Sequence, residues 1–126
     1  MHYASIHIKP QDVSEPVEQF ARRVYQKLGI AKMEERFLPN QDSRSYYVGS
    51  AAGIEFHVGP QNGKLGYPFF VSFGLDPSSQ SAEYLVEHAH FLAYRWSRDG
   101  WQCLVPDSES AFRHLRSEQV YAAFGD

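Results

Sequence analysis

The sequence has a single cysteine, Cys103, among 126 residues, and it has no surplus of basic residues. One cysteine excludes an internal disulfide framework and any zinc site built from several cysteines. Twelve Lys and Arg residues against fifteen Asp and Glu residues give a formal net charge of −3. Nucleic-acid binders usually carry a basic face that neutralises phosphates, whereas the basic residues here are scattered. We therefore expect no nucleic-acid partner.

Long apolar runs are also missing. A membrane-spanning helix needs roughly 20 consecutive apolar residues, and no run in this sequence approaches that length. Residues 1–4 lack the basic and apolar segments of a signal peptide, so we expect a cytoplasmic location and no membrane partner. At roughly 100–150 residues per domain, the length predicts one domain over residues 1–126.

Sequence motifs for catalysis are scarce. The chain has no Gly-x-Ser-x-Gly nucleophile motif, and the glycine-rich residues 49–53 lack the Lys-Ser/Thr that follows a phosphate-binding loop. Cys103 alternates with Trp101 and Val105, which is typical of a packed thiol rather than a nucleophile. We expect no cofactor. Whether the chain is an enzyme stays open at this point, with a non-catalytic role favoured.

Hydrophobic periodicity divides the chain into strands and two helices. Apolar residues recur at helical spacing over residues 17–28, where Gly29 is the expected C-cap, and over residues 81–98. We expect Phe20 and Leu92 to be core anchors of these helices. Alternation or apolar composition predicts strands over residues 3–9, 35–38, 45–48, 54–58, 68–75 and 101–105.

The order of these elements predicts an α+β domain. It is a mostly antiparallel sheet with two helices packed on one face, in the order strand-helix-three strands, then strand-helix-strand. Residues 108–124 fit either a broken helix or a hairpin, and we expect a helix.

Residues 21–30 (ARRVYQKLGI) and 70–76 (FVSFGLD) carry a family resemblance. The first resembles the first helix of the vicinal-oxygen-chelate superfamily, and the second resembles the strand that opens its second βαβββ module. That superfamily includes glyoxalases, ring-cleaving dioxygenases and bleomycin-resistance proteins. Metal-dependent members place a His in the first strand and a His or Gln at the start of the second module. Ser5 and Phe70 stand at or near those places here, so the resemblance implies a member without the metal chemistry.

The sheet face opposite the helices contains the candidate ligand-binding residues. We expect this face to carry Tyr3, Ser5, His7, Tyr47, Glu55, His57, Phe70, Ser72 and Gln102. His7, Glu55 and His57 would supply two imidazoles and a carboxylate, which suit a divalent metal. The alternative is an ordinary solvated sheet face, and we expect no bound metal.

Aromatic residues make up 15% of the chain, which is the unusual figure in its composition. Tyr46, Tyr47 and Tyr67 are expected at hairpin ends, where they would form a patch that binds a partner. Tyr84, Phe91 and Tyr94 form a second aromatic side of the long helix; the alternative is that the core absorbs these rings.

The sequence thus favours a non-catalytic binding module that holds a protein partner. Small acidic α+β domains resemble immunity or antitoxin proteins, so the expected partner is a toxin or a second copy of the chain. An acidic face would steer association with a basic toxin. The alternative is a vicinal-oxygen-chelate-type binder of a small molecule, or a metal-assisted enzyme, with a cup lined by His7, Tyr47, His57 and Phe70.

Overall fold

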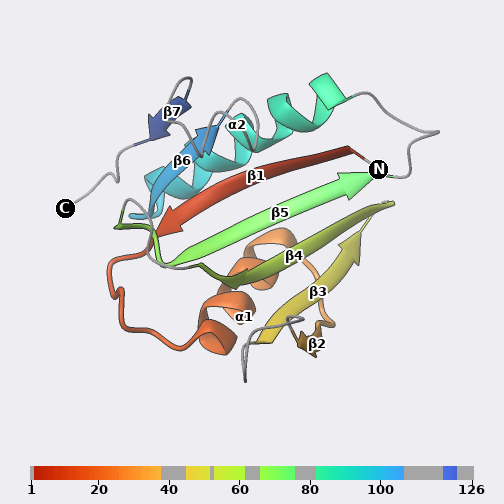
Figure 1. The fold of residues 1–126 in the computed structure, drawn as a ribbon, viewed down its shortest axis with the longest axis vertical. Coiled ribbons are helices and arrows are strands. Elements are labelled where there is room, and N and C mark those ends of the chain that lie inside the picture. The colour runs from red at the N-terminus through yellow and green to blue at the C-terminus, as the bar shows by residue number, and fades with distance from the viewer. Residues whose placement is uncertain are drawn as a thin grey trace.

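The computed structural model describes residues 2–37, 45–51, 53–61, 66–75, 82–106 and 118–121. Seven strands form one antiparallel sheet in the order β2-β3-β4-β5-β1-β6-β7 (Figure 1). The strands are β1 His2–Lys9, β2 Glu34–Phe37, β3 Ser45–Ala51, β4 Ile54–Pro60, β5 Phe69–Leu75, β6 Gln102–Pro106 and β7 Glu118–Tyr121. The predicted fold class, an antiparallel sheet with two helices, is confirmed.

Both helices lie on the same face of the sheet, behind it in Figure 1. Helix α1, Val17–Leu28, packs on β3 and β4, and helix α2, Ala82–Arg98, packs on β1 and β6. Gly29 ends α1 in the left-handed region, with φ of 73°, and its N–H donates to the carbonyl of Gln26. Glycine adopts this conformation without steric cost, so the predicted C-cap is confirmed.

Strand β1 lies between β5 and β6 in the sheet. Its neighbours β5 and β6 are both antiparallel to it and are therefore parallel to each other. Helix α2 connects them and crosses over β1 on the way. Strands β5 and β6 are consecutive in the chain, but β1 separates them in the sheet.

The core lies between the sheet and the helices. Alternate residues of the central strands supply it: Ala4, Ile6 and Ile8; Ile54, Phe56 and Val58; Phe69, Val71 and Phe73. Phe20 of α1 is fully buried, and its ring stacks on Phe69 at a centroid distance of 4.3 Å and lies 5.0 Å from Trp101. Leu92 is 7% exposed. Both residues belong to the core, as the periodicity predicts.

Tyr25 fastens α1 to the neighbouring hairpin. Its hydroxyl lies 2.7 Å from the carbonyl oxygen of Tyr47 in β3 and 2.9 Å from that of Phe56 in β4, and it donates to this pair. A Cβ at Gly49 would lie 2.9 Å from Tyr25 Cε1, so the absence of a side chain there lets the tyrosine ring approach β3. Burial raises the pKa of the Tyr25 hydroxyl well above its usual value of 10, which keeps it a hydrogen-bond donor.

One predicted element is wrong. Glu118–Tyr121 forms strand β7, paired with β6, rather than part of a helix. The short pattern around Val120 and Tyr121 fits either structure, and the free edge of β6 offers hydrogen-bonding groups that a strand can satisfy. The rest of the predicted helix, residues 108–117 and 122–124, lies outside the described residues.

Candidate functional site

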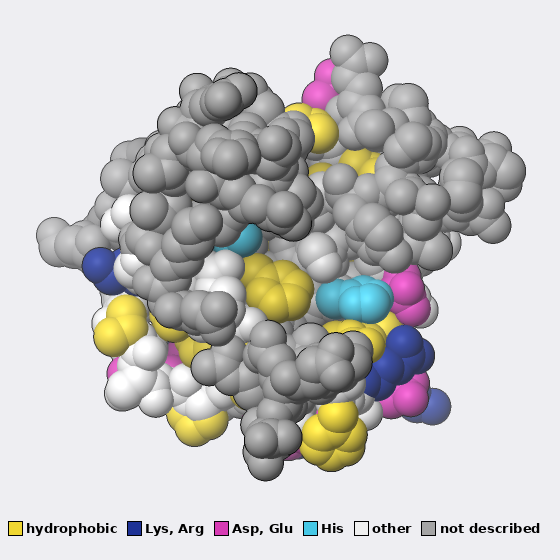
Figure 2. Space-filling model, in the orientation of Figure 1, with side chains coloured by type: hydrophobic (Ala, Val, Ile, Leu, Met, Phe, Trp, Pro, Cys, Tyr) yellow, Lys and Arg dark blue, Asp and Glu magenta, His cyan; other side chains and the backbone are white. Residues whose placement is uncertain are grey.

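The sheet face without helices carries a buried polar network near the end of β1. Figure 2 views this face, with histidine and hydrophobic side chains near its centre. His7 is 5% exposed, and its Nδ1 lies 2.6 Å from Oε1 of Gln61, so Nδ1 carries the proton that Gln61 accepts. The amide of Gln61 donates to the carbonyl of Tyr67, and Nε2 of Gln102 donates to the Tyr67 hydroxyl at 2.9 Å. These bonds hold the segment before β5 against the sheet.

A second group of polar side chains lies on the same face, on β4 and its neighbours. The ring of His57 stacks on Tyr46, with centroids 5.4 Å apart, and its Nε2 is 3.1 Å from Oε2 of Glu55. Both residues of this acid–imidazole pair are partly exposed. Arg36 on β2 forms an ion pair with Glu34 at 3.4 Å, which raises the pKa of the guanidinium further. The group is a polar, partly exposed surface.

The two groups do not form one metal site. In the register of the sheet, His7 is opposite Phe70 and His57 is opposite Ser72, so strand β5 separates the two histidines. With about 4.8 Å between strands and about 3.4 Å per residue, their backbones lie roughly 10 Å apart sideways and 7 Å apart along the strands. Among the described residues no group of three or more His, Cys, Asp or Glu could hold a metal ion. The structure brings together Glu55 and His57 and leaves His7 apart.

Phe70 lies between these groups on the helix-free face. It is half-buried, and a Cβ at Gly59 would lie 3.1 Å from its Cε1, so the ring covers the glycine of β4. Phe70 therefore packs across the middle of the predicted cup.

The three predicted partner-binding tyrosines do not share a surface. Tyr46 is half-buried on the helix-free face, whereas Tyr47 is 6% exposed and belongs to the core under α1. Its hydroxyl donates to Oε2 of Glu35 at 3.2 Å. Tyr67 is 3% exposed and packs with Leu104. The prediction of one exposed tyrosine patch is wrong, and so is the placement of Tyr47 in the cup, because adjacent residues of a strand point to opposite faces.

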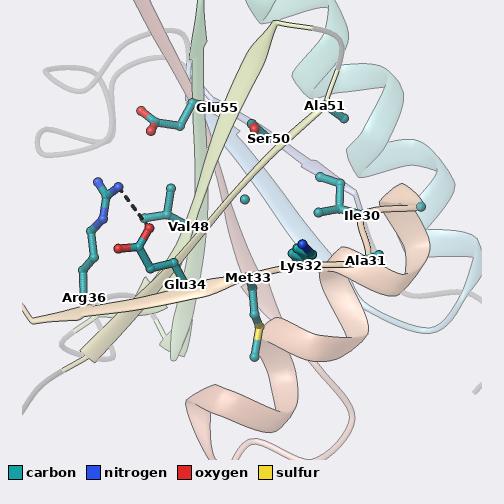
Figure 3. A pocket seen from close by; sticks show the side chains of 12 residues that line it. Ile30, Ala31, Lys32, Met33, Glu34, Arg36, Val48, Ser50, Ala51 and Glu55 are labelled. Atoms are coloured by element: carbon teal, nitrogen blue, oxygen red, sulfur yellow. Dashed lines mark hydrogen bonds and ion pairs between the residues drawn. The ribbon is translucent and has the colours of Figure 1, made fainter.

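A hollow of about 720 Å³ lies at the edge of the sheet, where the connection from α1 reaches β2 (Figure 3). Glu34, Arg36 and Glu55 lie on one side of β3 in this view, and Ile30 and Met33 lie on the other. The strand divides the lining residues into two groups. The hollow is therefore an open concave surface that continues on both sides of β3, and it is not an enclosed pocket.

A second hollow, of about 590 Å³, lies between the two helices. Ile54 and Phe56 of β4 line it from the sheet, and Leu28 of α1 and Leu92 of α2 line it from the helices. Charged residues line it as well: Nζ of Lys27 in α1 forms an ion pair at 2.7 Å with Asp99, the residue after α2, and lies over the Trp101 ring. Phe91 and Arg95 of α2 also line this hollow.

Helix α2 presents an exposed aromatic face beside this hollow. Phe91 is 54% exposed and Tyr94 is 47% exposed. An arginine four residues later covers each ring: the guanidinium carbon of Arg95 lies 5.9 Å from the Phe91 centroid, and that of Arg98 lies 5.8 Å from Tyr94. Both distances are within cation–π range, and Nη1 of Arg98 also donates to the Tyr94 hydroxyl at 3.2 Å. We call Glu87, Phe91, Tyr94, Arg95 and Arg98 the outer face of α2; all five are exposed.

The sequence predicted Phe91 and Tyr94 on this side of the helix and missed the arginines; the third predicted ring, Tyr84, has a side chain outside the described part of the chain. The signal was present, because Phe91 and Arg95, and Tyr94 and Arg98, are spaced i,i+4. Residues at this spacing are neighbours on a helix surface.

No family model matches this chain, and the comparison with curated proteins gives no match. No helix among the described residues is long and apolar enough to cross a membrane.

Two residues with nucleophilic or acid–base side chains, Cys103 and His88, lie in partly or fully buried surroundings. Cys103 is fully buried, and burial raises the pKa of its thiol to about 12, so the thiolate is scarce at neutral pH. His88 is partly buried: its ring meets Phe73 edge-on at 5.4 Å and stacks beside Phe91. Burial lowers the pKa of His88, which favours the neutral imidazole.

Proposed function

We propose that this protein is a non-catalytic binding module that holds a protein partner on the outer face of α2. The observation that carries the proposal is the pair of half-exposed aromatic rings, Phe91 and Tyr94, each covered by an arginine on one side. Aromatic residues and arginine are enriched where proteins bind one another, and they account for most binding hot spots.

The area left open on these rings supports the proposal. A large aromatic side chain buries about 150–250 Å² when fully covered, so a half-exposed ring leaves on the order of 100 Å² in water. At about 25 cal/mol per Å², covering Phe91 and Tyr94 contributes roughly 5 kcal/mol before the costs of association. The rings sit on a helix packed firmly on the sheet, so little conformational entropy is lost on binding.

The toxin-neutralising role expected from the sequence is one case of this proposal. Immunity and antitoxin proteins act by covering a toxin with a rigid surface. The outer face of α2 carries two arginines and one glutamate, so a net charge of −3 would attract a basic toxin through the rest of the chain rather than through this face. A toxin gene beside the gene for this chain would support that case, whereas a resistance or catabolic operon would favour the small-molecule alternative.

Affinity measurements with a purified partner test the proposal. Proteins retained by the immobilised chain from its own host are identified, purified and titrated calorimetrically against the wild type, a Phe91→Ala/Tyr94→Ala variant and a Phe37→Ala control. Phe37 is 69% exposed on β2, away from α2, so the control removes a ring that is more accessible than either ring of the double variant. We expect at least thirtyfold weaker binding for the double variant, which is about 2 kcal/mol, and unchanged binding for the control.

Two outcomes would overturn the proposal. One is a partner whose affinity is the same for the wild type and the double variant. The other is a retained small molecule, with no protein, whose retention depends on His57 or Phe70; this result would establish the vicinal-oxygen-chelate-type alternative instead.

A further inference from the structure

We infer that the outer face of α2 binds a second copy of this chain, with the two α2 helices antiparallel about a two-fold axis at Phe91. The inference rests on the proposed function, since it names the partner of the same surface. It follows from the order of charges along the helix.

The outer face forms one narrow stripe. At 100° per residue, Glu87, Phe91, Arg95 and Arg98 fall within about 80° of one another around the helix, and Tyr94 falls just beside them. The residues on the opposite side are buried against the sheet: Leu85, Ala89, Leu92, Ala93 and Trp96. The stripe is therefore available along the helix for contact with another helix.

The charges of the stripe are complementary to themselves when one copy is reversed. Glu87 precedes Phe91 by four residues and Arg95 follows it by four, so each charge lies about 6 Å from Phe91 along the axis. In an antiparallel pair with Phe91 against Phe91, Glu87 of each copy is level with Arg95 of the other. A two-fold axis makes this match twice. A parallel pair would place Glu87 against Glu87 and Arg95 against Arg95.

These two charges are available for the match. Within the part of the chain that the structure describes, neither Glu87 nor Arg95 takes part in an ion pair. The guanidinium carbon of Arg95 lies over the Phe91 ring, 5.9 Å from its centroid, and this contact uses none of its N–H groups as donors to a carboxylate. Tyr94 adds a polar hydroxyl to the same stripe, as is common at interfaces.

The size of the contact sets the expected strength. Helix α2 has 17 residues, about 25 Å in length, and one such helix against another buries less than the 1,200 Å² or so of a standard interface. We therefore expect a dimer that dissociates in the micromolar to millimolar range.

Charge reversal provides the decisive experiment. Sedimentation equilibrium from about 10 µM to 1 mM would compare the wild type, Glu87→Arg, Arg95→Glu and an equimolar mixture of the two variants. Each variant alone brings like charges together at both positions, so we expect its dimer to be about tenfold weaker than that of the wild type. In the mixture, the arginine introduced by Glu87→Arg meets the glutamate introduced by Arg95→Glu, and the native Arg95 of the first variant meets the native Glu87 of the second. We therefore expect a mixed dimer of wild-type strength.

The control is Lys32→Glu, which makes the same charge change as Arg95→Glu at an exposed site away from α2. We expect it to dimerise like the wild type. Circular dichroism of every variant shows whether it is folded. Folded variants that dimerise like the wild type, or a mixture that sediments no faster than its components, would overturn the inference.

The failure of this inference can be told apart from that of the proposed function. A wild-type chain that stays monomeric at 1 mM, and that loses a purified foreign partner in the Phe91→Ala/Tyr94→Ala variant, refutes the self-association and leaves the binding surface intact. A dimer unaffected by charge reversal and by that double variant refutes self-association at this face, and the titrations with a foreign partner then decide the proposed function separately.

Discussion

Replacing Phe20 by Ala tests the packing of a large, fully buried side chain of the core. Phe20 is fully buried, and its ring stacks on Phe69 at 4.3 Å and lies 5.0 Å from Trp101. Truncation of a buried phenylalanine costs about 3–5 kcal/mol, through lost burial and the cavity that remains. Stacking on Phe69 adds to the loss, so we expect the upper half of this range.

Urea unfolding followed by tryptophan fluorescence measures the effect. With a slope of about 2 kcal/mol per molar urea, a loss of about 4 kcal/mol lowers the midpoint by about 2 M. Trp101 lies beside the mutated ring, so its emission reports the local change as well. Phe20→Leu, which keeps most of the apolar volume, should lose less than half as much.

The matched control is Phe37→Ala, because Phe37 is 69% exposed and the same atoms are removed. We expect its free energy of unfolding to change by less than about 0.5 kcal/mol. Equal midpoints for Phe20→Ala and Phe37→Ala would show that α1 does not bury Phe20 against the sheet.

Three further predictions concern buried polar groups. Tyr25→Phe removes the hydroxyl shared by two backbone carbonyls and should lower the free energy of unfolding by about 1–3 kcal/mol in urea titration; no change would contradict the link between α1 and the hairpin. Cys103, whose thiol pKa is raised to about 12, should resist a thiol reagent at pH 8 and react only in urea, and rapid native labelling would refute its burial. Burial lowers the pKa of His88 below 6.5, so the unfolded chain binds more protons. The neutral His88 therefore makes its full contribution to stability above pH 6.5, and this contribution is lost as the pH falls below that value. Between pH 7.5 and pH 5.5, the free energy of unfolding should fall less for His88→Gln than for the wild type, and an equal fall would contradict the burial of His88.

Much of the candidate site depended on pairing that the sequence does not encode locally. Tyr46, Tyr47 and Val48 are three consecutive apolar or aromatic residues, so alternation alone leaves open which of them faces the helices. Pairing of Tyr47 with Val58 decides the matter, because Val58 already belongs to the core. His7 and His57 could be assigned to one face from alternation, but β5 lies between them only because of the strand order.

The remaining expectations concern function. The resemblance to the vicinal-oxygen-chelate superfamily and the cytoplasmic location stay predictions. Residues 21–28 of the first pattern belong to α1, with Gly29 and Ile30 after its end, and residues 70–75 of the second belong to β5.

The sequence by itself determined the two helices, their buried sides and the strands between them. These features follow from periodicity over neighbouring residues and from local devices such as Gly29, whose positive φ ends α1. Tertiary structure alone decided that Glu118–Tyr121 is a strand, that Tyr47 and Tyr67 are buried, and that Phe91 and Tyr94 stay open to solvent. Pairing with β6 and packing against other elements are contacts between residues far apart in the chain, and a local pattern carries no record of which partner lies opposite.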